Sequence, residues 1–581
     1  MLILDTLVSP SYNGVRLKHQ SKVILITILI VAAFLRINSL DQVPPSLFGD
    51  EVDVGYQAYS LLGTGQDLNG QSWPTLVHSL SEYRAPLFIY SAVPFVSLFG
   101  LNEWGVRLPA AFYGILGIFG IYLLSRELFN EKIGLLASGF LAISPWHLQY
   151  SRAGFEVTML LALLIFGTYF FLKGLEKKWL LIISAVVFGL TPYTYSTAIV
   201  FMPFLIVILL VLFRKQIKGL GVFGMLGLLG FFIILSPYIV QTLSGKSGER
   251  FNIISIFGNQ SIQDKVILAK QSEDLEISQK IFHNVDLTYL HFFFINYLRA
   301  YSPEFLFIYG DPNQRHSVGD MGEMYFFEML LLGFGLYGIF GGLRKKEFQL
   351  VLAWLLLAPI PAALTYDGGF HGTRNFLMIV PLMVILSLGL SDLTSELAIS
   401  KSKLSRLNWI PACAGMTLIV IGVFNVTFYL HRYHVDYPKI SWSAWHYGFK
   451  EVFQKEKSLD SQFTRVLINN TYEPALIRFL FWHQYDPGLF HHQFVTDKAS
   501  ADILPGFDGF NLGKYYFGKF NGPFEERLDS NTLWIASARD DITNPETLTD
   551  TRVKLLETIY SPTDEPIFYL ITGSMEMKNE Q

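Results

Sequence analysis

Residues 22–38 read KVILITILIVAAFLRIN, an apolar stretch long enough to cross a lipid bilayer as one α-helix. Three basic residues precede its apolar core and Arg36 follows it, and a cleavage site of the small-x-small kind is not evident. We therefore predict an uncleaved first transmembrane helix whose basic N-terminal side faces the cytoplasm.

The same pattern recurs along the chain. Hydrophobic residues make up 51% of the 581 residues, whereas charged residues make up only 16%. Ten further stretches have the length and composition of transmembrane helices: 105–124, 133–149, 157–174, 179–194, 196–213, 219–238, 324–343, 349–365, 375–391 and 409–430. We therefore predict an α-helical polytopic membrane domain over residues 1–430 with about eleven transmembrane helices.

The stretch 86–100 is apolar but short, and Pro86 and Pro94 lie within it. If it does not cross the membrane, the main basic clusters face the cytoplasm together with the N-terminus. These clusters lie at 126–132, 173–178, 214–218, 344–346 and 401–406. If the stretch does cross, all of them face the opposite side, so the positive-inside rule favours a re-entrant or interfacial helix at 86–100.

This topology puts nearly all of the long polar segments outside the cytoplasm. They are the first outer loop (39–104), a long outer loop (239–323) and the tail (431–581). The tail is long enough to fold alone. Its apolar runs at 466–468, 533–535 and 567–571 are typical of buried strands, and 474–485 is typical of a helix. We predict a small extracytoplasmic α/β domain.

Composition and motifs exclude several classes of function. The formal net charge is −4 and no basic block indicates nucleic-acid binding. Cys413 is the only cysteine, so the chain has neither an internal disulfide nor a thiolate metal cluster. GxSxG, Walker, HExxH and strand-linked GxGxxG motifs are missing from the sequence, which argues against nucleotide-driven chemistry.

An acidic pair, Asp50 and Glu51, follows the first predicted span in the run SLFGDEVD (46–53). Carboxylates at the outer lip of an apolar protein stay ionised and can act as a general base. The alternative is structural, with Asp50 capping a helix and Glu51 in its first turn. The apolar spacing of Val52, Tyr56, Tyr59 and Leu62 predicts an amphipathic helix along the membrane interface.

Two further segments on the outer side carry candidate residues. Tyr83 and Arg84 stand just before the short apolar stretch 86–100. The guanidinium of Arg84 can bind two oxygens of a phosphate; alternatively, Arg84 anchors the helix at lipid headgroups. The turn 151–156 contains Arg152 and Glu156. Glu156 is either a second carboxylate of the site or an ordinary acidic residue in the first turn of a helix. Arg152 could neutralise the charge of Glu156.

Two polar turns precede later spans. The turn 310–317 contains Arg315 and His316, and the glycine-rich turn 367–374 contains His371 and Arg374. Glycines allow such a backbone to bend close to a ligand. Neither histidine has a partner at metal-ligand spacing in the sequence, so we expect no metal and no other cofactor.

Together these motifs resemble the GT-C membrane glycosyltransferases, and most of all the family-39 group related to protein O-mannosyltransferases and to the aminoarabinose transferases of lipid A. The resemblance rests on the acidic pair, the YRAPL segment (83–87), the WxxRLP motif (104–109) and the SRxxxE turn (151–156). It covers residues 22–390 and does not extend to the tail.

The resemblance implies transfer of a sugar from a polyprenyl-phosphate carrier to an acceptor hydroxyl on a lipid, glycan or protein. Asp50 would be the general base with Glu51 beside it, and Glu156 would match the second acidic position. Arg84 stands where many relatives carry Lys before Pro-Pro, and Arg374 would help to hold the carrier phosphate. The remaining candidates for donor binding are Tyr83, Arg152, His371, Arg315 and His316.

The residue types fit this chemistry. Fixed arginines can stabilise a departing phosphate without a metal ion, and one base without a covalent nucleophile predicts inversion at the sugar carbon. We expect an integral protein of the bacterial plasma membrane whose active site faces away from the cytoplasm. A flippase for a lipid-linked sugar and a polysaccharide polymerase or ligase are the rival interpretations, although a transporter would favour mid-span charges and an inverted repeat.

Overall fold

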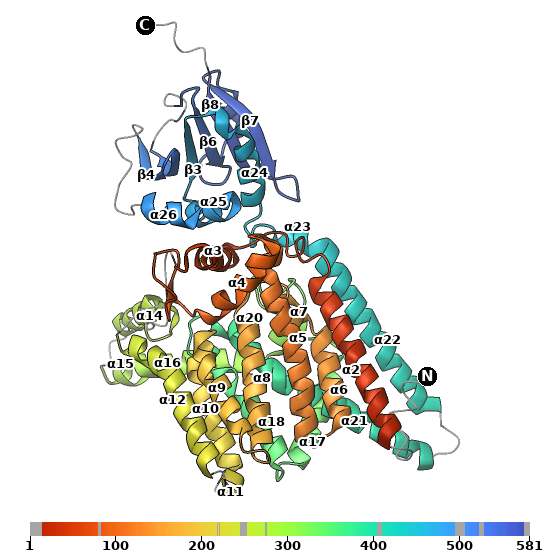
Figure 1. Cartoon of the computed structure of the whole chain (residues 1–581). Coiled ribbons are helices and arrows are strands. Elements are labelled where there is room, and N and C mark those ends of the chain that lie inside the picture. The colour runs from red at the N-terminus through yellow and green to blue at the C-terminus, as the bar shows by residue number, and fades with distance from the viewer. Residues whose placement is uncertain are drawn as a thin grey trace, which may run out of the picture.

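The computed structural model describes residues 14–79, 83–217, 219, 221–244, 253–272, 276–403, 409–493, 506–521, 524 and 528–574. A bundle of long helices forms one part, and a mixed β-sheet with its helices lies beyond one end of that bundle (Figure 1). Lys218, Arg406 and Glu82 lie outside the described residues, as does the side chain of Cys413.

Each of the eleven apolar stretches coincides with helix. The bundle helices are α2 (Gly14–Ile37), α5 (Glu103–Leu128), α6 (Glu131–Ile143), α7 (Pro145–Tyr150), α8 (Val157–Gly174), α9 (Leu180–Leu190), α10 (Thr197–Leu212), α11 (Arg214–Ile217), α12 (Gly221–Leu243), α17 (Glu328–Gly341), α18 (Lys346–Leu357), α19 (Ile360–Ala363), α21 (Ile379–Lys403) and α22 (Trp409–His431). Within the described residues, seven helices are long and apolar enough to cross a membrane, and shorter apolar helices lie among them. The α-helical membrane fold is therefore confirmed, whereas the number of spans stays a prediction.

Prolines account for the main differences between the predicted spans and the helices. The span 133–149 is two helices because Pro145 begins α7 after a break at Ser144. The span 349–365 is likewise divided, since α18 ends at Leu357 and Pro361 lies in the separate helix α19. These breaks lie toward the end of the bundle that carries the polar turns, where the chain leaves regular helix and presents side chains.

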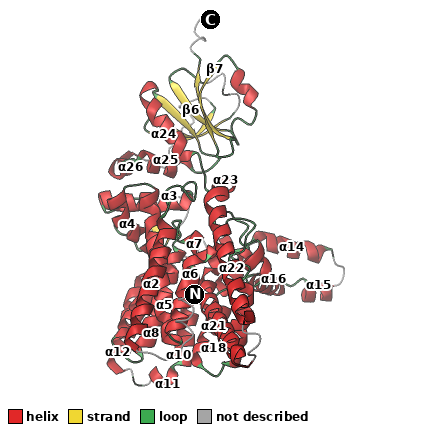
Figure 2. Ribbon diagram, turned by 90° about the vertical axis from the view of Figure 1, so that its right-hand side faces the viewer, coloured by secondary structure: helices red, strands yellow, loops and turns green. Residues whose placement is uncertain are grey.

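The short stretch 86–100 forms helix α4 (Leu87–Phe99), with Pro94 inside it. Thirteen helical residues extend about 20 Å, which is less than the roughly 30 Å of a bilayer core. Helix α4 packs against α3 (Gly49–Thr64) and α5 at the sheet-domain end of the bundle (Figure 2). Its length agrees with the predicted interfacial or re-entrant helix.

Helix α3 differs from the expected amphipathic helix in its surroundings. Val52 and Tyr56 are buried as expected, but Val54, Gly55 and Ala58 are buried too. The reason is that α25 (Ala475–His483) of the tail covers the outer side of α3, so this helix is enclosed between the bundle and the tail (Figure 1). The packing is close, because a Cβ added to Gly55 would lie 2.5 Å from the Phe481 ring.

The tail folds as a six-stranded sheet with strand order β4-β5-β3-β6-β8-β7. The strands are β3 (Arg465–Asn469), β4 (Phe507–Leu512), β5 (Tyr515–Phe520), β6 (Thr532–Ser537), β7 (Val553–Tyr560) and β8 (Pro566–Gly573). Strand β3 pairs in parallel with β5 and β6, and the other pairs are antiparallel. The three predicted strands are β3, β6 and β8, whose residues are almost all buried.

The remaining elements connect or cover these two parts. Helices α24 (Phe449–Leu459), α25 and α26 (Pro487–Gln493) accompany the sheet, and η5 (Arg432–Asp436) with α23 (Tyr437–Ser441) leads to it from α22. The predicted long outer loop is largely helical, with α14 (Gln260–Gln271), α15 (Glu276–Phe282), α16 (Val285–Arg299) and η2 (Glu304–Ile308). Short elements complete the chain: β1 (Val77–His78), β2 (Tyr83–Arg84), η1 (Thr191–Tyr193), η3 (Gly368–Phe370), α20 (Gly372–Asn375), η4 (Phe376–Met378), η6 (Asp460–Gln462) and η7 (Pro545–Thr549).

Candidate active site

Arg84 is the centre of the candidate site. It lies on β2, which pairs with β1 in a short antiparallel ladder of the first outer loop. Its side chain is only 9% exposed and faces three carboxylates. It forms an ion pair with Asp50, and its guanidinium nitrogens lie 3.4 Å from Asp53 Oδ2 and 3.8 Å from Glu156 Oε1. Asp50, Arg84 and Glu156, which the sequence offered as separate candidates, therefore lie together in the structure.

Asp53 is a member of this group that the sequence analysis missed. It stands one helical turn after Asp50 on α3, so both carboxylates reach the same guanidinium. Burial raises the pKa of Asp53 and the charge of Asp50 raises it further, whereas Arg84 lowers it. Asp50 differs because its side chain is 45% exposed, which leaves it accessible from outside. The i, i+3 spacing of the two acids was the available signal.

A cavity of about 290 Å³ adjoins Arg84, and we call it the arginine pocket. Four predicted residues line it: Tyr83, Arg84, Glu156 and Arg374. The other lining residues are Leu76, Ala85, Pro192, Thr194, Tyr195, Ser196, Thr197, Ile199, Val200, Tyr238, Thr242, Ile254, Pro361 and Thr365. The pocket thus combines two arginines and one glutamate with apolar and tyrosine walls, a composition suited to a ligand with an anionic head and an apolar remainder.

Arg374 reaches the arginine pocket from the glycine-rich turn. It belongs to α20, and its guanidinium donates a hydrogen bond to Thr365 Oγ1 at 2.8 Å and pairs with Asp367. Arg374 and Arg84 therefore line the same cavity although they lie far apart in the sequence.

Glu51 has a structural place, contrary to the prediction that it stands beside the base. It is fully buried and accepts hydrogen bonds from Arg107 Nε at 2.9 Å and from the backbone N–H of Gly154 at 2.8 Å. Arg107, from the WxxRLP motif, also donates to the carbonyl oxygens of Leu40 and Pro44. This pair ties the start of α3 to α5 and to the turn before Glu156, and it turns Glu51 away from the arginine pocket.

Arg152 is also structural, and the idea that it neutralises Glu156 is not supported. It is 1% exposed, and its guanidinium donates to the carbonyl oxygens of Leu35, Asn38 and Val43 at 2.6, 2.8 and 3.0 Å. It also lies over the ring of Tyr433, 5.2 Å from the centroid. Arg152 therefore joins the end of α2 and the following loop to the chain that leads to the tail.

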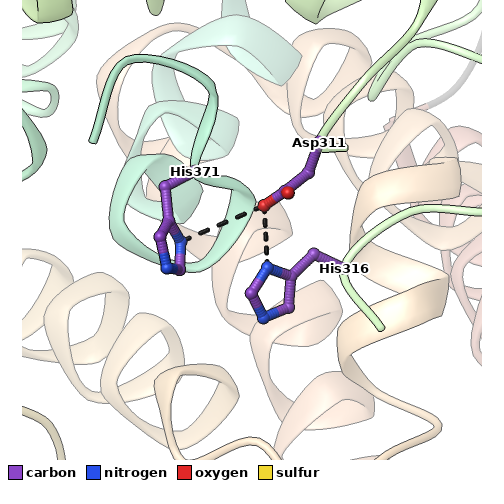
Figure 3. Close-up of side chains that lie close together, drawn as sticks. All are labelled: Asp311, His316 and His371. Atoms are coloured by element: carbon purple, nitrogen blue, oxygen red, sulfur yellow. Dashed lines mark hydrogen bonds and ion pairs between the residues drawn. The ribbon is translucent and has the colours of Figure 1, made fainter. Parts of the chain in front are cut away.

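His316 and His371 meet at Asp311 next to this site (Figure 3). His316 Nδ1 donates to Asp311 Oδ2 at 2.7 Å, His371 Nδ1 lies 4.0 Å from the same oxygen, and the Gly372 N–H donates to it at 2.6 Å. Burial alone would raise the pKa of Asp311, but the two facing imidazoles hold this pKa below its usual value. Asp311 therefore fastens the 310–317 turn to the turn that carries Arg374.

This arrangement corrects the argument that the two histidines lack a partner at metal-ligand distance. Ligand atoms of Asp311, His316 and His371 lie within 4.8 Å of one another. These residue types bind Zn²⁺, whose tetrahedral ligands stand about 3.3 Å apart, so the group would have to contract slightly around an ion. The group of Asp311, His316 and His371 does not line the arginine pocket. Arg315 does not line it either, and instead lies over the Phe48 ring at the start of α3.

Comparisons with known proteins agree with this architecture. Residues 83–240 match the family described as dolichyl-phosphate-mannose-protein mannosyltransferase, which is less than half of the chain. ArnT from Cupriavidus metallidurans bound to undecaprenyl phosphate is similar over 96% of this chain and 99% of its own, with 13% identity and a TM-score of 0.51. ArnT from the same organism in the apo state is similar over 95% of this chain and 97% of its own, with 12% identity and a TM-score of 0.50. The chain therefore shares the fold of ArnT, which confirms the predicted GT-C fold.

A second similar structure is the oligosaccharyltransferase AglB from Archaeoglobus fulgidus in complex with an inhibitory peptide and a dolichol-phosphate. It is similar over 80% of this chain with 14% identity and a TM-score of 0.49, and the similar region spans 64% of that longer protein. A comparison with curated protein sequences finds no match.

We predict that Glu51→Gln destabilises the protein whereas Asp50→Asn leaves its stability nearly unchanged. Removing one partner of a fully buried ion pair leaves Arg107 without its counter-ion and costs about 3–5 kcal/mol, whereas Asp50 is nearly half exposed. Thermal unfolding of the two purified variants in the same detergent measures this difference. Equal melting temperatures would contradict the structural assignment of Glu51.

Proposed function

We propose that this protein is an inverting glycosyltransferase that moves a sugar from a polyprenyl-phosphate carrier to an acceptor hydroxyl on a lipid, glycan or protein. The observation that carries the proposal is the arrangement around Arg84, a buried arginine that lines the arginine pocket and pairs with the partly exposed Asp50. The family match over residues 83–240 and the undecaprenyl phosphate in the ArnT structure support it.

The carrier phosphate would lie between Arg84 and Arg374. When the bond between the sugar carbon and the phosphate oxygen breaks, its electron pair goes to the phosphate, and two fixed guanidiniums would stabilise the growing charge. Apolar side chains in the same cavity, among them Ile199 and Val200, suit the first part of a prenyl chain. Tyr83, Tyr195 and Tyr238 offer rings and hydroxyls for the sugar.

Asp50 would act as the general base. It lies at the outer end of the Arg84 contact, where an acceptor can approach, while Asp53 is buried and Glu156 lies within the pocket. A phosphate that engages Arg84 would compete with Asp50 for the guanidinium and leave the carboxylate ready to take the acceptor proton. The acceptor oxygen then bonds to the sugar carbon from the face opposite the phosphate, which inverts that carbon.

Asp50→Asn is predicted to lower sugar transfer by about 10²–10⁴-fold, because an amide cannot accept the acceptor proton. The measurement is release of polyprenyl phosphate from a polyprenyl-phosphate hexose or pentose in membrane vesicles that contain the protein and its acceptor. Asp320→Asn is the matched control, since Asp320 is highly exposed and does not line the pocket. Undiminished transfer by Asp50→Asn would refute the assignment of the base.

We further propose that transfer needs no metal ion or other cofactor, because Arg84 and Arg374 supply the positive charge that a metal would otherwise provide. Treatment of the purified protein with EDTA should then leave the transfer rate unchanged. Loss of transfer that Zn²⁺ restores would contradict this proposal and would point to the Asp311, His316 and His371 group.

We propose that the arginine pocket opens outside the cytoplasm of a bacterial plasma membrane. The basic clusters at 126–132 and 344–346 lie at the end of the bundle away from the sheet domain, as the positive-inside rule requires. A reporter fused after Arg126 should therefore be cytoplasmic, and one fused after Gly573 should be external. The reverse pattern would contradict the orientation.

A further inference from the structure

The sheet domain contains a second cavity of about 390 Å³. Its lining residues are Thr471, Lys519, Phe520, Phe524, Trp534, Asp540 and Asp541, and we call it the edge cavity. None of these residues lines the arginine pocket, and among them only Trp534 belongs to a segment that the sequence analysis named, the predicted strand 533–535. The edge cavity is therefore a separate candidate for ligand binding.

The topology of the sheet puts the edge cavity where open α/β sheets bind ligands. The carboxyl ends of β3, β5 and β6 share one edge because these strands are parallel. The lining residues lie at or beyond those ends except for Trp534, which lies within β6. The chain runs from β3 to β4 on one side of the sheet and from β6 to β7 on the other. Such a reversal between adjacent parallel strands opens a crevice outside their carboxyl ends.

One wall of the edge cavity is aromatic and includes a buried N–H donor. Phe520 and Phe524 pack against Trp534, with ring centroids 4.9 and 4.7 Å from it. The indole Nε1 of Trp534 is buried and has no hydrogen-bond partner among the described residues. A buried donor without a partner costs free energy, so a hydrogen bond from Nε1 to a bound group would be favourable. Aromatic faces beside convergent polar groups are typical of sites for small polar organic ligands.

The carboxylates of two consecutive residues, Asp540 and Asp541, form the polar side of the edge cavity. Asp541 accepts a hydrogen bond from the Ser537 N–H at 2.7 Å, and Asp540 Oδ2 accepts one from Thr471 Oγ1 at 3.3 Å. Burial raises the pKa of Asp541 to about 6, and the neighbouring charge of Asp540 adds to this. Paired carboxylates repel phosphates, which argues against a nucleotide, and they accept hydrogen bonds from hydroxyl groups. Lys519 also lines the cavity, but the two carboxylates outnumber it, so the chemistry favours a polyhydroxylated ligand without negative charge.

The segment after β3 links the edge cavity to the candidate active site. Thr471 lines the cavity, and two residues later Glu473 lies 3.2 Å from His446 and 3.5 Å from Arg478. Arg478 Nη2 in turn lies 3.2 Å from the position of a Cβ on Gly49, the residue before Asp50. A series of contacts through Glu473 and Arg478 therefore connects the edge cavity with the start of α3.

We propose that the edge cavity binds a saccharide unit of the acceptor substrate, so that the tail selects acceptors that already carry sugar. The role in acceptor selection rests on the proposed glycosyltransferase function, whereas saccharide binding itself does not. The aromatic wall would contact the apolar face of the sugar ring, and Asp540 with Asp541 would accept hydrogen bonds from its hydroxyls.

Saturation-transfer NMR of the full-length protein in detergent tests the binding. The probes are mannobiose, cellobiose and chitobiose, with glucose 1-phosphate as the anionic comparison. We expect at least one neutral disaccharide to bind and glucose 1-phosphate not to bind. Asp540→Asn and Asp541→Asn should each weaken that binding by about tenfold, the effect of losing one good polar contact. The matched control is Asp564→Asn, an exposed turn residue that does not line the cavity and whose positive φ suits asparagine.

The two proposals fail in different ways. Asp50→Asn should keep disaccharide binding while it loses transfer. Asp540→Asn should bind the disaccharide more weakly yet still release polyprenyl phosphate when the acceptor carries no sugar. Absence of binding by all three disaccharides, or equal binding by wild type, Asp540→Asn and Asp541→Asn, would overturn the saccharide site. Asp540 is exposed, so Asp540→Asn remains decisive if Asp541→Asn does not fold.

Discussion

The site depends on one electrostatic constraint, a single buried guanidinium that serves three carboxylates. Arg84 contacts Asp50, Asp53 and Glu156, and its side chain is largely withdrawn from water. One positive charge cannot compensate three negative charges at low dielectric, so at least one carboxyl must take a proton or find another cation. Burial raises the pKa of Asp53, which favours a protonated carboxyl at this position and reduces the excess negative charge. Among the three carboxylates, Asp50 lies at the exposed end of this group.

Two other arginines make this geometry possible without taking part in it. Arg107 fixes Glu51 and thereby orients the first turn of α3, so that Asp50 points toward Arg84. Arg152 gathers carbonyl groups that follow α2, which holds the approach to α3 in place. Both side chains are buried, and their hydrogen bonds offset the cost of desolvating them. The tail completes the enclosure, since α25 packs over α3 and Arg478 lies beside Gly49.

Hydrophobic length was enough to predict the helices and the fold class, because each membrane helix must satisfy its own backbone and carry an apolar surface. The same signal located β3, β6 and β8, which are buried on both faces. It missed β4, β5 and β7, whose residues are partly exposed, and it missed the helices of the long outer loop. Those elements depend on packing more than on their own composition.

The side-chain partners were harder to predict than the elements. Adjacent residues of a helix point about 100° apart, so Asp50 and Glu51 face different partners, and the sequence alone does not say which one faces the pocket. Asp311, His316 and His371 come together only because two distant turns meet. Arg84, Glu156 and Arg374 were predictable as a group because the predicted topology puts all of them on one side of the membrane, and in the structure they line one cavity.

The most direct test of this account is a structure of the protein with a polyprenyl phosphate bound. The account predicts a phosphate between the guanidiniums of Arg84 and Arg374, with Arg84 drawn away from Asp50 and the Asp50 carboxylate open to the outer side. A phosphate bound elsewhere, with the ion pair between Arg84 and Asp50 intact, would contradict it.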